Sequence, residues 1–275
     1  MEKALKNNLP VVAVRGGGDL ATGVIQKLWR AGFAVLILET PVPLAIRRTV
    51  ALCTAVKEST YTVEDVTAVR VNTADECIDV WASGRVPLLV DPKADCLPQL
   101  QPGILVDAII AKRNIGTNRQ MAPLTIGLGP GFCAQQDVDV VVETMRGHNL
   151  GRLILEGSAL ANTGIPGELG GKSAERVVHA PFGGIVRHKH IIGDVVNKED
   201  ILFYIDENPV FSPLTGTLRG LIAEGITIPK GLKCVDVDPR PAKDVDCYSI
   251  SDKARCLGGA VLEACLWLGR IKNIL

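Results

Sequence analysis

The chain has 275 residues, of which 47% are hydrophobic and 4% aromatic, and it carries 30 Lys and Arg against 30 Asp and Glu. This apolar content is typical of a folded protein with an aliphatic core and excludes a largely disordered chain. The zero net charge argues against a broad nucleic-acid surface, so no nucleic-acid partner is expected. No apolar run is long enough to span a membrane, and the N-terminus lacks the apolar core of a signal peptide. We therefore expect a cytoplasmic protein without a membrane partner.

Strands and helices alternate in the first half of the sequence. Residues 11–14 predict a buried strand, residues 20–31 a helix ended by Gly32, and residues 33–38 a strand that ends in Glu39. A second helix is predicted at 74–82. The further strands are predicted at 66–71, 86–90, 104–111, 124–128, 138–142 and 153–155. This alternation predicts an α/β fold with a Rossmann-like, mostly parallel sheet.

A glycine-rich turn joins the first strand to the first helix. Gly16, Gly18 and Ala21 match the G-x-G-x-x-A fingerprint of dinucleotide-binding domains. In that fingerprint the first glycine permits the tight turn, the second lets a pyrophosphate approach the backbone, and the alanine lets the helix pack close to the sheet. The helix N-terminus offers N–H groups and partial positive charge to the phosphates.

An acidic residue, Glu39, closes the second strand at the distance where such domains hold a ribose. Asp19 departs from the pattern, because a carboxylate in the loop would repel phosphate, and we expect it to cap the helix instead. The alternative is a glycine turn that only packs helix on strand. The predicted cofactor-binding set, with NAD or NADP as the candidate cofactor, is Gly16, Gly17, Gly18, Asp19, Leu20, Ala21, Thr22 and Glu39.

Other polar groups follow predicted strands and are open to two interpretations each. Arg47 and Arg48 are either a clamp for phosphate or carboxylate, or a solvated basic pair. Lys112 and Asn114 lie beyond the carboxyl end of a strand, where α/β sheets bind ligands, or form a charged turn. The glycine-rich loop at 127–132 is either an anion nest or a sharp turn. Asp107, among apolar neighbours, would need a partner if it is buried. Glu143, Arg146 and His148 are better explained as a surface ion-pair cluster than as site groups.

An internal repeat occupies the second half. Residues 180–205 and 212–237 align without gaps at an offset of 32, and the alignment matches Pro181 with Pro213 and Arg187 with Arg219. Each copy predicts a set of short strands. The pattern is similar to the barrel-sandwich hybrid of biotinyl and lipoyl carrier domains. The junction at 206–211 has no lysine, so covalent biotin or lipoate is not expected. We expect a structural or docking module instead.

The last predicted element is a helix at 249–268, with Ser251 or Asp252 as its N-cap. We expect a Rossmann-like domain at 1–175, onto which this helix packs, and a barrel-sandwich domain at 176–240. The eight cysteines form no C-x-x-C pair, so a metal site is not expected. Cys133, in a glycine-rich loop, is the candidate for a reactive thiol. His188 and His190 would share one strand face but lack a third ligand.

Several segments together resemble the selenium-dependent molybdenum hydroxylase accessory family, which is distantly similar to xanthine dehydrogenase maturation factors. The segments are RGGGDLATG at 15–23, PLAIRRTV at 43–50, VDP at 90–92, DAIIAKRN at 107–114, GPGF at 129–132, ETMRGH at 143–148 and LGR at 150–152. The resemblance covers nearly the whole chain. It implies a role in maturing a molybdenum hydroxylase, with the apo-enzyme or its molybdenum cofactor as partner, but it carries no catalytic residues over.

Three functions stay open at this point. The first is an accessory protein that uses a bound nucleotide to assemble a molybdoenzyme. The second is an NAD(P)-dependent oxidoreductase of a small metabolite, with Lys112 as its proton-transfer residue. The third is a scaffold whose glycine loop holds nothing. A homo-oligomer is compatible with each of them.

Overall fold

The computed structural model describes residues 9–164, 167–168 and 170–275, and these residues form two units. The sheet unit contains the described residues up to Pro43, together with Ala51–Asn162 and Ile250–Leu275. The β unit contains Leu44–Val50 and the described residues of Thr163–Ser249. The break expected after residue 175 thus lies after Asn162, and an earlier segment of the chain also belongs to the β unit.

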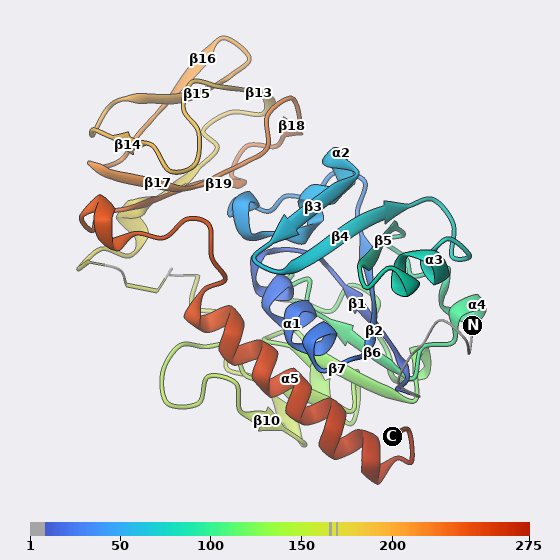
Figure 1. Ribbon diagram of the computed structural model, residues 1–275. Helices are drawn as coiled ribbons and strands as arrows, with labels where there is room; N and C mark the ends of the chain where they lie inside the picture. Colours follow the sequence, from blue (N-terminus) through green and yellow to red (C-terminus); the bar gives the residue numbers. More distant parts are fainter. Residues whose placement is uncertain (1–8, 165–166, 169) are drawn as a thin grey trace. The chain divides into compact units, whose positions relative to one another are not determined.

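A nine-stranded sheet forms the centre of the sheet unit, in the order β10-β9-β7-β6-β1-β2-β5-β4-β3 (Figure 1). Neighbouring strands from β4 to β9 run parallel, and the edge strands β3 and β10 run antiparallel to their neighbours. The expected α/β class with a mostly parallel sheet is confirmed. The strands are β1 Val11–Arg15, β2 Ala34–Glu39, β3 Thr60–Val63, β4 Val66–Val71, β5 Val86–Val90, β6 Ile104–Asp107, β7 Leu124–Leu128, β9 Val140–Val142 and β10 Leu153–Ile154. A separate ribbon pairs β8 Cys133–Ala134 with β11 Gly157–Ser158.

Helices cover both faces of the large sheet, because the chain moves towards one edge from β1 to β2 and towards the other edge from β4 to β5 and β6. Right-handed crossovers place α1 (Asp19–Arg30) on one face, and α3 (Cys77–Ala82) and α4 (Leu97–Leu100) on the other. Trp81 and Leu97 pack with buried side chains of β1, β2 and β6. Helix α5 (Asp252–Ile271) lies beside α1 and also contacts β7 and β9 (Figure 1). The remaining α-helix, α2, spans Ala55–Glu58.

Helices α1 and α5 approach each other closely enough to touch with their backbones. A β-carbon added at Gly23 would lie 2.3 Å from the carbonyl oxygen of Ala254, and one added at Gly258 would lie 2.3 Å from that of Gly23. At the start of α5 the Ser251 side chain accepts a hydrogen bond of 3.2 Å from the Ala254 amide, which confirms it as the N-cap. The helix expected from residue 249 therefore begins at Asp252.

Asp139 links the C-terminal end of α5 to the sheet through hydrogen bonds. Its carboxylate accepts hydrogen bonds from the Thr125 amide (2.8 Å), the Lys272 ammonium (3.0 Å) and the Arg119 guanidinium (2.9 Å). Burial raises the pKa of Asp139, but these donors outweigh burial and the net shift is downward. The ionised carboxylate therefore stabilises the folded sheet unit.

Several expected elements have bounds that differ from those observed. The strand expected at 104–111 ends at Asp107, because the Asp107 carboxylate accepts the Ile109 amide at 3.1 Å and the backbone then turns. Ile110 and Lys112 have positive φ angles of 58° and 64°, which no strand contains. The helix expected from residue 74 begins at Cys77. Strand β3 was not predicted at all, since its alternate residues are exposed at the sheet edge.

Two four-stranded antiparallel sheets form the β unit, in the orders β12-β19-β17-β14 and β16-β15-β13-β18. The repeat offset of 32 carries β12 to β16, β13 to β17, β14 to β18 and β15 to β19, so it exchanges the two sheets. In each sheet the two outer strands belong to one repeat and the two inner strands to the other. The strands are β12 Val177–His179, β13 Gly184–His188, β14 Val195–Val196, β15 Ile201–Ile205, β16 Asn208–Phe211, β17 Gly216–Leu221, β18 Thr227–Ile228 and β19 Lys233–Asp238.

The segment Leu44–Val50 joins the β unit although it is far away in the sequence. The Leu221 amide donates to the carbonyl of Ile46 at 2.8 Å, and Arg48 Nε donates to the carbonyl of Leu221 at 2.8 Å. Ile46 packs on the apolar core that both repeats share. None of the helices in the described part of the chain is long and apolar enough to cross a membrane.

Candidate functional site

The glycine loop lies at the carboxyl edge of the parallel sheet, between β1 and α1. Gly16 has a φ of +93°, and a β-carbon there would lie 3.2 Å from the carbonyl oxygen of Ala108. A β-carbon on Gly17 would lie 3.0 Å from the Cys53 nitrogen. A β-carbon on Gly18 would meet nothing within 4 Å. Packing therefore explains the first two glycines, whereas the third leaves open space above the loop.

The start of α1 differs from the expectation for Asp19. Gly18 is the N-cap, with φ −66° and ψ −179°, and Asp19 is the first helical residue, so Asp19 does not cap the helix. Amides in the first helical turn have no partner within the helix and can serve an anion. Thr22 is buried and structural: its hydroxyl donates to the Gly18 carbonyl at 2.9 Å and accepts the Leu52 amide at 3.0 Å.

Two further members of the predicted set support the helix rather than the open space. Ala21 is fully buried, as a residue in a close helix–sheet contact must be. Leu20 is half-buried.

Glu39 is held against the loop at the end of β2. Its Oε2 accepts the Gly17 amide at 2.8 Å, and its Oε1 accepts the Thr40 amide at 2.7 Å. One amide of the glycine loop therefore serves the carboxylate and not a phosphate. Each oxygen of an ionised carboxylate can accept a further hydrogen bond, so Glu39 can still receive a ribose hydroxyl.

A buried ion pair lies where the strand order reverses, between β1 and β6. Arg15 Nη1 lies 3.5 Å from Asp107 Oδ2, Arg15 also donates to Thr117 Oγ1, and Thr117 donates to Asp107 at 2.6 Å. Arg15 Nη2 donates to the Pro92 carbonyl at 3.0 Å. Burial raises the pKa of Asp107, and Thr117, the Ile109 amide and Arg15 counteract part of the shift. This network ties the ends of β1 and β6 to the loops after β5 and β6.

Lys253 brings a positive charge to the same edge and was missed in the sequence. It is half-buried in the first turn of α5. Burial lowers the pKa of its ammonium and Arg146 lowers it further, while Asp19, Glu143 and Asp252 act in the opposite direction. Asp19 of α1 and Glu143 after β9 therefore both lie close enough to act on Lys253. Nothing in the linear pattern signals this, because residues 19 and 253 are brought together only by the α1–α5 contact.

The remaining groups expected near the site have mostly structural partners. Glu143 is buried and accepts the Met145 and Leu160 amides at 2.7 and 2.9 Å. Arg146 pairs with Asp252 at 2.8 Å and not with Glu143, so the prediction of a surface ion-pair cluster is wrong for Glu143.

The loops after β6 and β7 are tied by local contacts. Lys112 is exposed, and the Asn114 side chain closes its own turn by accepting the Thr117 amide at 2.9 Å. A β-carbon on Gly131 would lie 2.5 Å from the backbone of Arg113, so this glycine is required by loop packing.

Two other sequence hypotheses refer to the β unit. Arg47 is buried and Arg48 bonds a backbone carbonyl, so the interpretation of a solvated basic pair is wrong. His188 and His190 have separate partners, the Ile222 carbonyl at 2.8 Å and Asp194 at 3.1 Å. Among the residues that the structure describes, no three His, Cys, Asp or Glu side chains are placed to hold a metal ion.

None of the eight cysteines forms a disulfide bond, and they differ in accessibility. Cys133 is half-buried, whereas Cys256 is exposed and was not singled out in the sequence. Burial raises the pKa of four other thiols to about 12, those of Cys77, Cys96, Cys234 and Cys265. Cys256 is therefore the thiol that solvent reaches most easily.

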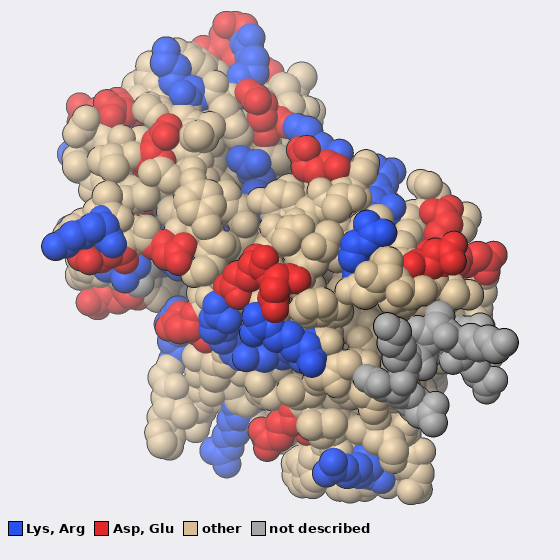
Figure 2. Space-filling view, in the orientation of Figure 1, with Lys and Arg blue, Asp and Glu red and all other residues tan. Residues whose placement is uncertain are grey.

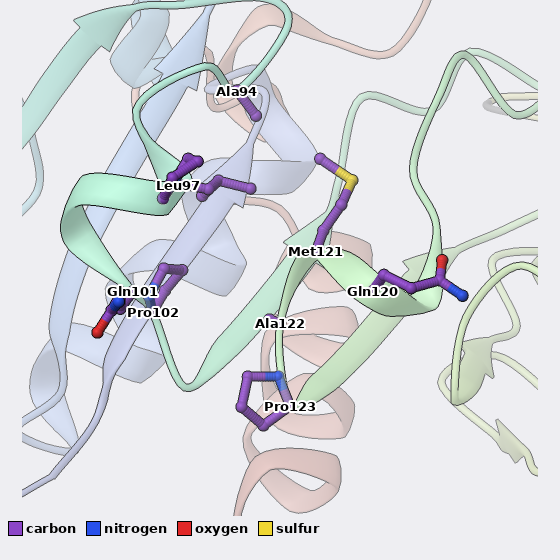
Figure 3. A pocket seen from close by; sticks show the side chains of 9 residues that line it. Ala94, Leu97, Gln101, Pro102, Gln120, Met121, Ala122 and Pro123 are labelled. Atoms are coloured by element: carbon purple, nitrogen blue, oxygen red, sulfur yellow. The ribbon is translucent and has the colours of Figure 1, made fainter.

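A separate pocket of about 820 Å³ lies beside α4, away from the glycine loop. Figure 3 shows Leu97 from α4 and Met121 from the segment before β7 on its wall, with Pro102 and Pro123 at the starts of β6 and β7. These positions belong to the amino edge of the parallel strands, opposite the glycine loop. On the face drawn in Figure 2, acidic and basic side chains are interspersed, with no broad field of one sign.

Comparison with known proteins gives one strong sequence match. No family model matches the chain. The protein YqeB of Escherichia coli strain K12, which is described as uncharacterized, is 45% identical over 258 residues. The match covers 94% of this chain and 48% of that protein, so the chain spans about half the length of the curated relative it matches.

Solved structures give only weak likenesses. The ectoine utilization protein EutE (DoeB) from Ruegeria pomeroyi, with product bound, is 12% identical, with 84% of this chain and 86% of that chain covered and a TM-score of 0.26. A succinylglutamate desuccinylase/aspartoacylase from Rhodobacter sphaeroides is 11% identical, with 83% and 85% covered and a TM-score of 0.24. At these TM-scores the likenesses support no conclusion about fold or activity.

Proposed function

We propose that the glycine loop binds the pyrophosphate of a dinucleotide, with NAD or NADP as the candidate. The observation that carries the proposal is the open space over Gly18, next to the N-terminus of α1 and at the point where the strand order reverses. In this proposal the sheet unit is a Rossmann-like domain. The strand order β5-β2-β1-β6-β7-β9 supports it, because it is the order of doubly wound nucleotide-binding sheets.

The residues around the loop fit such a ligand. The first-turn amides of α1 and the Lys253 ammonium supply positive charge for the phosphates. Glu39 accepts a ribose hydroxyl while Gly17 and Thr40 hold it in place. Asp19 opposes the phosphates, and Lys253 offsets its charge. When bound, the nicotinamide supplies hydride chemistry.

We propose further that the protein serves as an accessory in the maturation of a selenium-dependent molybdenum hydroxylase. This proposal rests on the family resemblance of the sequence segments given above, several of which lie at the carboxyl edge of the sheet. The partner would be the apo-enzyme or its molybdenum cofactor. The β unit would be a barrel-sandwich hybrid that docks this partner. Each sheet combines two strands of one repeat with two of the other, which supports that fold. The turn at Asp206 and Glu207, where carrier domains have their modified lysine, contains no lysine.

The test of nucleotide binding is titration calorimetry of NAD, NADP and ATP with wild type and Gly18→Val. The valine side chain would occupy the open space, and the extended backbone of Gly18 accepts it at a cost of about 1 kcal/mol as a poorer N-cap. Gly259→Val is the matched control, because Gly259 is exposed on α5 with open space around it. We expect binding to be lost in Gly18→Val and kept in Gly259→Val. A wild type that binds none of the three nucleotides contradicts the proposal.

The alternative is an NAD(P)-dependent oxidoreductase. In that enzyme Lys253 is a better candidate than Lys112 for the proton-transfer residue. Its pKa is lowered, and a lysine with a lowered pKa beside the cofactor can transfer protons. Capture of an apo molybdenum hydroxylase by the immobilised protein would support the accessory role. Steady-state hydride transfer to a free metabolite, without such capture, would support the oxidoreductase.

A further inference from the structure

Three arginines from distant segments meet inside the β unit. Arg47 comes from the segment Leu44–Val50, Arg176 precedes β12, and Arg219 belongs to β17. Arg47 is 9% exposed and Arg176 5%, and the side chain of Arg219 is 14% exposed. Long cationic side chains are seldom buried to this extent, and the carboxylates near these three are those of Asp236, Asp238 and Asp246. We call these three residues the arginine cluster.

The nearby carboxylates leave Arg219 without a close contact. Asp238 accepts two hydrogen bonds from the Arg240 guanidinium, at 2.9 and 2.7 Å. Asp236 accepts a hydrogen bond from Arg176, and its other oxygen is 3.9 Å from Arg219 Nη1, beyond hydrogen-bond distance. Arg219 Nε is buried and makes no hydrogen bond with any described residue.

The electrostatic environment of Arg219 is unfavourable to its charge. Burial lowers the pKa of the guanidinium, Arg47 and Arg176 lower it further, and Asp236 and Asp238 counteract them. A guanidinium nevertheless stays protonated in proteins. Burial and mutual repulsion raise the free energy of the three charged side chains. An anion bound among them would offset this cost.

The strand geometry directs Arg219 into the cluster. The register of β17 against β19 shifts between Leu218 and Gly220, so Arg219 lies at a bulge, where an extra residue re-aims its side chain. Arg187, the matching residue of the first repeat, lies on a regular stretch of β13, is 57% exposed and pairs with Glu207 at 2.7 Å. The two copies therefore differ in burial and partners at the same repeat position.

We propose that Arg219, together with Arg47 and Arg176, binds a tetrahedral oxyanion of the phosphate class. Planar guanidinium groups bind such anions through paired N–H donors, which suits a converging set of arginines better than single ammonium groups would. The exposed part of the Arg219 side chain gives the anion access from solvent. The site lies entirely within the β unit and is independent of the glycine loop.

The test is titration calorimetry of sodium phosphate against the full chain carrying Gly18→Val, with sodium chloride of equal ionic strength as the blank. The Gly18→Val background removes phosphate binding at the glycine loop. Arg219→Gln is compared with Arg187→Gln, the same substitution at the matching repeat position. We expect Arg219→Gln to weaken phosphate binding at least about tenfold, the value of one charge-assisted contact, and Arg187→Gln to leave it unchanged. Phenyl phosphate distinguishes an ester-borne phosphate group from the free ion.

Thermal unfolding without phosphate separates binding from folding. Because Arg219→Gln removes a repelled charge, we expect its midpoint to equal or exceed that of the parent. Should the glutamine variant fail to fold, Arg219→Lys keeps the charge without the planar fork and should bind phosphate more weakly than the parent. Equal phosphate binding in the Arg219 and Arg187 variants, or binding of neither phosphate nor phenyl phosphate by the parent, would overturn the proposal.

Discussion

The contact between α1 and α5 can be tested with one added methyl group. Gly23→Ala would place a β-carbon 2.3 Å from the Ala254 carbonyl oxygen and 2.8 Å from the Ala254 β-carbon. Both distances are well below van der Waals contact, and backbone atoms cannot rotate away, so the two helices must separate. Gly259→Ala adds the same methyl group to α5, where no atom lies within 4 Å.

The comparison of these two variants isolates the cost of the clash. Both replace a helical glycine with alanine, which by itself stabilises a helix by about 1 kcal/mol. Overpacking costs about 1–3 kcal/mol, and contact with a backbone oxygen places Gly23→Ala at the upper end. We expect the free energies of unfolding to differ by about 3 kcal/mol, which is roughly 6–12 °C between the midpoints. Gly259→Ala should be more stable than wild type.

Tryptophan fluorescence during thermal or urea unfolding measures this difference. Trp29, Trp81 and Trp267 all belong to the sheet unit, so the signal reports on that unit alone. Gly258→Ala, which faces the Gly23 carbonyl oxygen at 2.3 Å, should behave like Gly23→Ala. If Gly23→Ala proves as stable as Gly259→Ala, the close backbone contact between α1 and α5 does not exist.

Three further predictions concern single side chains. Asp139→Asn should lower the stability of the sheet unit by about 2–4 kcal/mol at pH 7 in urea unfolding, because buried donors lose a charged acceptor. A carboxylate whose pKa is lowered by folding contributes stability above its unfolded pKa and loses it as pH falls through the folded value, so this difference should shrink towards pH 3. A thiol reagent at pH 8 should react first with Cys256, and Cys256→Ser should remove that fast phase. Lys253→Gln should weaken dinucleotide binding about tenfold in calorimetry, while Lys243→Gln, exposed in the β unit, should not.

Each of these predictions has a result that contradicts it. A pH-independent effect of Asp139→Asn would show that the charge of the carboxylate contributes nothing. Fast labelling that persists in Cys256→Ser would place the accessible thiol elsewhere. Equal dinucleotide affinities for the Lys253 and Lys243 variants would remove Lys253 from the site.

Local patterns in the sequence determined much of the secondary structure. Strands β4, β5 and β7 have the predicted bounds, because short aliphatic runs between turn residues determine buried strands without long-range information. Ser251 caps α5 as expected, since a cap depends only on residues within one turn. The repeat offset was also readable, and the structure shows that it relates two whole sheets.

Only the tertiary structure decided which polar residues act together. Arg187 and Arg219 are matched in the repeat, yet one is solvated and the other is buried beside two arginines from remote segments. Lys253 reaches the edge with the glycine loop only because Gly23 and Gly258 let two helices touch. Burial and charge depend on neighbours that lie up to more than 200 residues away in the chain, and a linear pattern carries no information on such contacts.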